Sequence, residues 1–163
     1  MKIFITGVAG FLGSHLADLM ISQGHTVAGN DNMIGGYADN VPQNVEFSQV
    51  DCCDLENLTK PREGCDVVYH TAATAYEGLS VFSPVLVTRN IFEASVTTIT
   101  AAIRNKVKRI VYCSSMARYG HHDDVPYKET YECRPQDPYG IAKKAGEDVL
   151  KNLCETHGVE YVI

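Results

Sequence analysis

Short runs of apolar residues alternate along the chain with longer stretches in which apolar positions recur every three or four residues. The short runs are typical of buried strands, and the periodic stretches are typical of helices that bury one face. The expected strands are residues 3–5, 25–29, 45–50, 66–70, 109–113 and 158–163. The expected helices are residues 11–22, 55–60, 84–105 and 138–156, with loops at 33–44, 74–83 and 116–136. This alternation predicts an α/β fold, a Rossmann-type doubly wound parallel sheet with the sixth strand at the end of the chain.

The first expected strand runs directly into a turn with three glycines, and Phe11 and Leu12 then open a helix. This order predicts a phosphate site, because free backbone N–H groups and the positive end of the helix dipole meet there. Gly7 permits the tight turn, Gly10 lets the backbone approach a pyrophosphate, and Gly13 lets the helix pack closely on the strand. The spacing is GxxGxxG and differs from the usual GxGxxG fingerprint. We expect a dinucleotide here; a glycine turn without a ligand is the alternative.

Carboxylates follow the second and third expected strands. Asp31 is placed to accept hydrogen bonds from the adenosine ribose hydroxyls and to repel a 2′-phosphate, which favours NAD over NADP. The alternative is a loop-capping role for Asp31, which Asn30 and Asn32 beside it could share. Asp51 and Cys52 would by their position lie along the adenine edge, although an Asp after a strand is often only a cap or a turn residue.

Tyr139 and Lys143 are four residues apart at the start of the last expected helix and therefore lie on one helix face. An ammonium near a phenol favours the phenolate, so the pair predicts a lowered Tyr139 pKa and a general base. Ser114 and Ser115 end the fifth strand, where a hydroxyl can bind the substrate oxygen whose proton Tyr139 takes. The periodicity does not decide which of the two serines faces the substrate.

Composition narrows the class of protein. The 163 residues are enough for one domain, and the formal net charge of −6 argues against nucleic acid or an anionic membrane as a partner. No apolar stretch approaches the roughly 18 residues of a membrane span, and no signal-peptide pattern is present. No metal site is expected, since the cysteines form no CxxC pair and no His stands at ligand spacing from them. We therefore expect a cytoplasmic protein with reduced thiols, at Cys52, Cys53, Cys65, Cys113, Cys133 and Cys154.

Taken together, these residues resemble the extended short-chain dehydrogenase/reductase superfamily, in its branch of nucleotide-sugar epimerases and dehydratases. The resemblance covers the whole chain. It is carried by residues 6–13, Asp31, Asp51, residues 70–73, Asn90, residues 114–120 and residues 139–143.

The resemblance implies roles for these residues. Tyr139 is the catalytic base, Lys143 binds the nicotinamide ribose and lowers the Tyr139 pKa, and NAD is held tightly. The active Ser/Thr stands four residues before the Tyr of the family's Tyr-Gly pair, here Tyr119-Gly120, which selects Ser115. His70 is expected as a strand-end residue beside the cofactor. The remaining cofactor-binding residues implied are Asn32, Cys52, Thr71, Ala72, Ala73, Asn90 and Ser114.

The segment after Ser115 bears on the reaction. Related dehydratases carry Asp-Glu there, decarboxylases a Glu, and 3,5-epimerases a Cys, whereas this chain has Met116 and Ala117. The resemblance therefore implies a UDP-sugar 4-epimerase that oxidises a hydroxyl and returns the hydride to the other face. A dehydrogenase, dehydratase or decarboxylase of the superfamily and an inactive NAD-binding module are the alternatives. Arg118 replaces a small apolar residue of the family, and we expect it to point to solvent.

The last departure is length. Family members are roughly twice as long, and their second half builds the sugar pocket. Residues 1–163 are therefore expected to be the NAD-binding domain alone, without the substrate domain. The family usually dimerises through its two long helices, here residues 84–105 and 138–156, which predicts a homodimer.

Overall fold

The computed structural model describes residues 1–163 and contains one parallel sheet of six strands in the order β3-β2-β1-β4-β5-β6. This confirms the predicted Rossmann-type fold. The strands are β1 (Lys2–Thr6), β2 (Thr26–Asp31), β3 (Val45–Gln49), β4 (Val67–His70), β5 (Arg109–Tyr112) and β6 (Glu160–Val162). The second strand reaches two residues further than predicted, so Asn30 and Asp31 pair with Ser48 and Gln49 of β3 inside the sheet.

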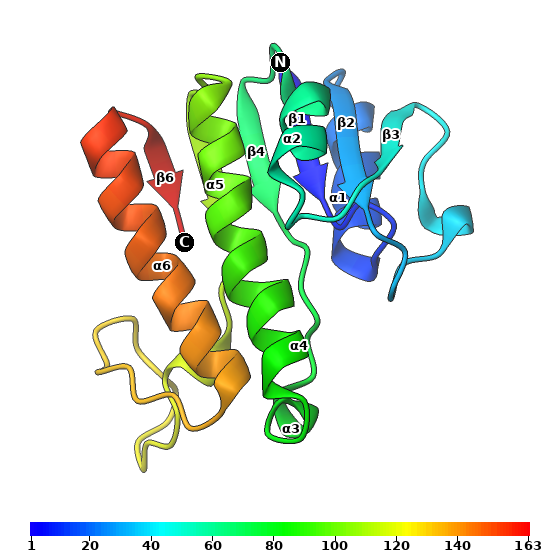
Figure 1. Ribbon diagram of the computed structural model, residues 1–163. Helices are drawn as coiled ribbons and strands as arrows, with labels where there is room; N and C mark the ends of the chain where they lie inside the picture. The colour runs from blue at the N-terminus through cyan, green and yellow to red at the C-terminus, as the bar shows by residue number, and fades with distance from the viewer.

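Helices cover both faces of the sheet (Figure 1). Helix α1 lies behind the sheet, and α2, α5 and α6 lie in front of it (Figure 1). The helices are α1 (Phe11–Ser22), α2 (Leu55–Thr59), α3 (Glu77–Ser80), α4 (Pro84–Thr88), α5 (Ala94–Arg104) and α6 (Pro138–His157). Four shorter segments are the 3₁₀ turns η1 (Ala38–Asn40), η2 (Lys60–Arg62) and η4 (Met116–Arg118) and the π-helical η3 (Arg89–Glu93). None of the helices is long and apolar enough to cross a membrane.

Two expectations about the middle of the chain were incomplete. The predicted long helix over 84–105 is present, but η3 interrupts it with π-helical geometry between α4 and α5. Such π turns insert one residue into the helical ladder and cannot be recognised from apolar periodicity. The loop predicted at 74–83 contains the short helix α3.

The path of the chain creates the crevice in which the site lies. From β1 the chain moves outward to β2 and β3, then returns to β4 on the other side of β1. Thr6 at the end of β1 therefore stands between Asn30 of β2 and His70 of β4. Ligands of open parallel sheets bind where the strand order reverses in this way, outside the carboxyl ends of the strands.

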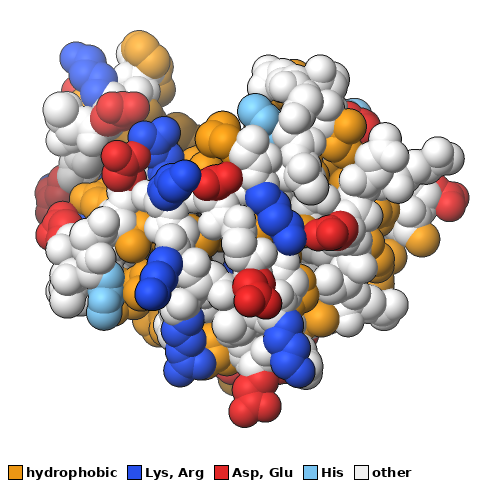
Figure 2. Space-filling model, turned by 90° about the horizontal axis from the view of Figure 1, so that it is seen from above, with side chains coloured by type: hydrophobic (Ala, Val, Ile, Leu, Met, Phe, Trp, Pro, Cys, Tyr) orange, Lys and Arg blue, Asp and Glu red, His pale blue; other side chains and the backbone are white.

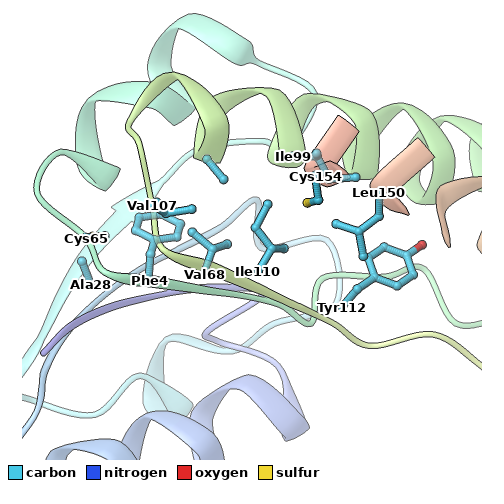
Figure 3. Close-up of a cluster of buried hydrophobic side chains, with 11 residues drawn as sticks. Phe4, Ala28, Cys65, Val68, Ile99, Val107, Ile110, Tyr112, Leu150 and Cys154 are labelled. Carbon is cyan, nitrogen blue, oxygen red and sulfur yellow. The ribbon is translucent and has the colours of Figure 1, made fainter. Parts of the chain in front are cut away.

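Side chains alternate between two apolar layers, as the period of two along a strand requires. Phe4, Val68 and Ile110 point from the sheet toward α5 and α6, where they meet Ile99 and Leu150 (Figure 3). Their neighbours in β1 and β2 point the other way and pack against α1. Burial on both faces stabilises the central strands and fixes the end of β1 from which the glycine turn leaves.

The end of the molecule at which the strands begin carries charges of both signs (Figure 2). Lys2 pairs with Glu46 at 3.3 Å, and Lys108 pairs with Asp66 at 2.7 Å. Basic and acidic side chains are therefore interspersed on this face, and the face is not uniformly positive (Figure 2).

Helix α6 begins as its sequence predicts. The Asp137 side chain accepts a hydrogen bond of 2.8 Å from the Gly140 N–H, and Pro138 occupies the first turn. Gly158, with a φ of 68°, ends the helix in the left-handed conformation. These signals fix where α6 begins and ends, and the face that it buries carries Tyr139 and Lys143.

Candidate functional site

A pocket of about 440 Å³ opens at the carboxyl ends of the strands. Every residue that the sequence predicted to bind a cofactor lines it, whereas Ser115 does not. The predicted residues along its wall are Gly7, Gly10, Phe11, Leu12, Gly13, Asp31, Asn32, Asp51, Cys52, Thr71, Ala72, Ala73, Asn90, Ser114, Tyr139 and Lys143.

The glycine turn forms one end of the pocket. Gly7 has a φ of 71°, and a Cβ there would meet the Ala72 Cα at 2.8 Å. A Cβ on Gly13 would collide with the Gly7 carbonyl. The Gly7 N–H donates to the Asn30 carbonyl at 2.7 Å, which fixes the turn to β2. No side chain caps the start of α1 at Gly10, so the first N–H groups of the helix are available to an anion from the pocket.

The Asp31 carboxylate accepts a hydrogen bond from the glycine turn and also lies on the wall of the pocket. One of its carboxylate oxygens accepts from the Ala9 N–H at 3.1 Å, and the other accepts from the Met33 N–H at 2.8 Å. The loop-capping role and the position on the pocket wall therefore coexist. Each oxygen retains acceptor capacity for a ligand hydroxyl, since a carboxylate offers about four lone-pair sites.

Asp51 lies on the wall of the pocket and is held there by a network of hydrogen bonds. It accepts hydrogen bonds from the Cys53 N–H at 2.8 Å, from Asn32 at 3.2 Å and from Arg89 at 3.3 Å. Burial raises the pKa of Asp51, but these hydrogen bonds and the Arg89 charge outweigh burial and hold that pKa below its usual value. Arg89 was not found from the sequence, because nothing in its local pattern shows that η3 carries it over to Asp51.

The surroundings of the Tyr139–Lys143 pair contradict one prediction, the direction of the Tyr139 pKa shift. Lys143 donates to the Cys113 carbonyl at 2.8 Å, and its Nζ lies 5.9 Å from the centroid of the Tyr139 ring. Burial lowers the pKa of Lys143 to about 8. Burial also raises the pKa of Tyr139, with a hydrogen bond from Ser115 opposing it. The predicted lowering of the Tyr139 pKa is therefore wrong, since desolvation dominates and the Lys143 ammonium donates to the Cys113 carbonyl.

The two serines at the end of β5 have different partners. The Ser114 hydroxyl donates to the carboxylate of Glu147. Ser115 caps the turn η4 by accepting from the Ala117 N–H at 3.1 Å, and its hydroxyl lies near enough to that of Tyr139 to lower the pKa of Tyr139. Geometry therefore places Ser115 next to the phenol and Ser114 against α6.

His70 stands at the end of β4, as expected, but away from the pocket, and Arg118 lies elsewhere than expected. His70 is buried in the core between Thr6, 2.8 Å from its Nδ1, and Ser95, 3.1 Å from its Nε2, and it does not line the pocket. Burial, with the charges of Lys143 and Arg62, holds the pKa of His70 well below its usual value. The expectation that Arg118 points to solvent is wrong, because its guanidinium lies 3.2 Å from a carboxylate oxygen of Glu147.

Glu147 is the main residue of this region that sequence reasoning missed. It is fully buried on α6, one helical turn after Lys143. The spacing Tyr139, Lys143, Glu147 repeats every four residues, which is the signal that would have placed it on the same helix face.

The fold and the pocket define a Rossmann-type protein with its ligand crevice at the carboxyl ends of parallel strands. The model of the NAD dependent epimerase/dehydratase family matches residues 3–163. The chain therefore belongs to this family, which confirms the membership predicted from its motifs.

Relatives of known name agree with this assignment. The chain is 31% identical to the Arabidopsis thaliana protein named "Probable UDP-arabinose 4-epimerase 3", over 99% of this chain and 42% of that protein. The UDP-glucose 4-epimerase of Thermotoga maritima, solved with UDP-glucose, superposes with a TM-score of 0.94 at 32% identity, over 99% of this chain and 53% of that one. The Thermus thermophilus UDP-glucose 4-epimerase, solved with NAD, gives a TM-score of 0.93 at 32% identity with the same coverage. The chain thus spans about half the length of these relatives.

Proposed function

We propose that residues 1–163 form the NAD-binding domain of a nucleotide-sugar epimerase that inverts C4 of a UDP-sugar. The observation that carries this proposal is a single pocket lined by the glycine turn, by Asp31, and by the Tyr139–Lys143 pair. Family membership and the names of the relatives, which are UDP-arabinose and UDP-glucose 4-epimerases, support the reaction class.

The residues of the pocket fit NAD. The uncapped N–H groups at the start of α1 would bind the pyrophosphate. Asp31 would accept hydrogen bonds from the adenosine ribose, and its charge would repel the 2′-phosphate of NADP. Lys143, held by the Cys113 carbonyl, would donate to the nicotinamide ribose from the opposite end of the pocket.

Proton transfer is assigned to this chain's own residues. NAD, when bound, would supply the acceptor and the donor of the hydride that leaves the sugar carbon and returns to it. The Tyr139 hydroxyl would take the proton of the sugar hydroxyl, with Ser115 orienting that hydroxyl beside it. Because burial raises the pKa of Tyr139, the positive charge of Lys143 is needed nearby when the phenolate forms.

The segment after Ser115 favours epimerisation over the other reactions of the family. Elimination of water needs a further acid and base, and Met116 and Ala117 offer no titratable group. Oxidation and re-reduction at one carbon need only the Tyr139 proton acceptor and the returning hydride. A dehydrogenase would instead release NADH, so net accumulation of NADH with a sugar nucleotide would favour that alternative.

We also propose a homodimer through the helical layer of α4, α5 and α6. Apolar side chains on and beside α4 project into solvent, with Phe82 at 82% and Val85 at 83% exposure. An exposed apolar surface of this kind is typical of a contact with another chain. Sedimentation equilibrium at micromolar concentration should give twice the monomer mass, and Val85→Glu should return it to one.

The cofactor claim is tested by calorimetric titration of the protein with NAD and NADP. We expect NAD to bind with at least tenfold preference, and Asp31→Asn to reduce that preference by removing the charge that repels a 2′-phosphate. Equal affinity for the two dinucleotides in the unaltered protein would contradict the role of Asp31.

The reaction is tested by incubating the longest gene product that contains residues 1–163, loaded with NAD, with UDP-glucose, UDP-arabinose and UDP-N-acetylglucosamine, and separating the C4 epimers by chromatography. Formation of the epimer without net NADH supports the proposal. The absence of product from every UDP-sugar, in a protein that binds NAD, would contradict the proposed reaction.

A further inference from the structure

The proposed chemistry leaves one buried carboxylate without a role. Glu147 on α6 has no exposed surface, and Ser114 donates a hydrogen bond to one of its oxygens. The other oxygen lies 3.2 Å from the Arg118 guanidinium. A buried carboxylate is strongly unfavourable unless it is paired, and Ser114 and Arg118 are the partners that Glu147 has here.

Arg118 is held on three sides. Its side chain is only 19% exposed, its Nε donates to the Cys133 sulfur at 3.2 Å, and its guanidinium lies 4.9 Å from the centroid of the Tyr119 ring. It ends the turn η4, which Ser115 begins. The ion pair with Glu147 therefore fastens the segment that presents Ser115 to the helix that presents Tyr139.

A second contact shows how closely η4 and α6 approach each other. A Cβ on Gly140 of α6 would lie 2.6 Å from the Ala117 carbonyl of η4. With η4 and α6 this close, a displacement of Arg118 from Glu147 would change the distance between Ser115 and Tyr139 directly.

The pair also lies in the electrostatic surroundings of Lys143. Glu147 follows Lys143 by one helical turn, and its negative charge favours the ammonium. Arg118 adds a positive charge on the far side of that carboxylate. The titratable and charged groups around Lys143 are Tyr112 and Cys113 from β5, His70 from β4, Tyr139 and Glu147 from α6, and Arg118 from η4.

We propose that Arg118 and Glu147 are a pair of positioning residues: Glu147 holds Ser114 and supports the charge of Lys143, while Arg118 offsets part of the carboxylate charge and fixes the Ser115 segment. The inference rests on the proposed function, since it concerns the Tyr139–Lys143 chemistry. Neither residue touches the reacting atoms.

Substitutions of the two residues should shift the pKa of Lys143 in opposite directions. Glu147→Gln removes a neighbouring negative charge and keeps the shape, so the pKa of Lys143 should fall below about 8. Arg118→Met leaves the carboxylate without its counter-charge, so the pKa of Lys143 should rise. Each change should amount to about one pH unit, which is the usual size for the gain or loss of one nearby charge. If the pair had a purely structural role, the two variants would not shift the pKa of Lys143 in opposite directions.

The experiment is an NMR titration of lysine carbons labelled at Cε, with the Lys143 signal identified by its loss in Lys143→Met. Opposite displacements in Glu147→Gln and Arg118→Met support the proposal. Displacements in the same direction, or none, overturn it. Lys144→Met is the matched control, since Lys144 pairs with Asp148 on the exposed face and should leave the Lys143 titration unchanged.

A second comparison keeps the inference testable if Glu147→Gln does not fold. Arg118→Lys retains the charge and should keep the Lys143 pKa near that of the unaltered protein, in contrast to Arg118→Met. Equal titrations in these two variants would refute the role of the Arg118 charge. The titration needs neither NAD nor a sugar, so failure of the unaltered protein to bind NAD would contradict the proposed function and leave this result unaffected.

Discussion

The two ends of the pocket are built in different ways. At the glycine turn the chain offers backbone N–H groups and close approaches such as that of Gly7 to Ala72. At the other end it offers buried side chains whose pKa values depend on neighbours, Lys143 lowered to about 8 and Tyr139 raised. The first end is determined by short-range backbone geometry, and the second by packing between β5, η4 and α6. Substitutions at the two ends should therefore affect different measurements.

The largest effect is expected at the side-chain end. Tyr139→Phe removes the proposed proton acceptor, and we expect epimerase turnover to fall roughly 10²- to 10⁴-fold. NAD affinity should change little, because the ring and its packing remain. Turnover is measured with a UDP-sugar and affinity by calorimetry. Tyr161→Phe, which removes a hydroxyl from the exposed strand β6, is the control and should leave both values unchanged. Retention of full turnover in Tyr139→Phe would exclude the phenol as the base.

The backbone end should respond in affinity and stability. Gly7→Val places a branched side chain at a φ of 71° and against the Ala72 backbone. We expect destabilisation by about 1–3 kcal/mol from strain alone. Loss of the pyrophosphate hydrogen bonds should weaken NAD binding on the order of 100-fold. Gly78→Ala is the control, since nothing lies within 4 Å of a Cβ there. NAD affinity unchanged in a folded Gly7→Val protein would show that the turn does not hold the phosphates.

The same contrast explains how much could be predicted from the sequence. The glycine turn, Asp31 and the start of α6 at Asp137 are local signals, and the structure brings the predicted cofactor residues to one pocket. Arg118 was misplaced because its partner, Glu147, is remote in sequence and belongs to another element.

Other errors have a similar origin. The pKa of Tyr139 was given the wrong direction because spacing on a helix reveals a nearby Lys but not the desolvation of the phenol. The π turn η3 cannot be recognised from apolar periodicity, so the link from Arg89 to Asp51 could not be foreseen. In each case the missing information is tertiary: which buried group faces which, and how much water remains.

A smaller effect concerns pH. The pKa of Lys143 is about 8 in the folded protein against 10.5 for an ordinary lysine. Between these values the unfolded chain binds more protons than the folded one, so the contribution of Lys143 to stability rises with pH. Relative to Lys143→Met, the unaltered protein should gain about 2 kcal/mol in free energy of unfolding from pH 8 to pH 10. Urea unfolding at several pH values measures this difference. A constant difference would show that Lys143 titrates normally.

The smallest effect is expected at Arg89, which does not line the pocket but contacts Asp51, which does. Arg89 and Asp51 form an ion pair of 3.3 Å in which the Arg89 side chain is 44% exposed. Exposed pairs contribute little because water screens them, so Arg89→Ala should cost no more than about 1 kcal/mol of stability. NAD affinity should change by less than about fivefold, since Asp51 keeps its hydrogen bonds from Cys53 and Asn32. A loss of NAD affinity comparable with that of Gly7→Val would place Arg89 in direct contact with the dinucleotide. The contrast between a backbone end and a side-chain end of the pocket would then not account for all of the binding.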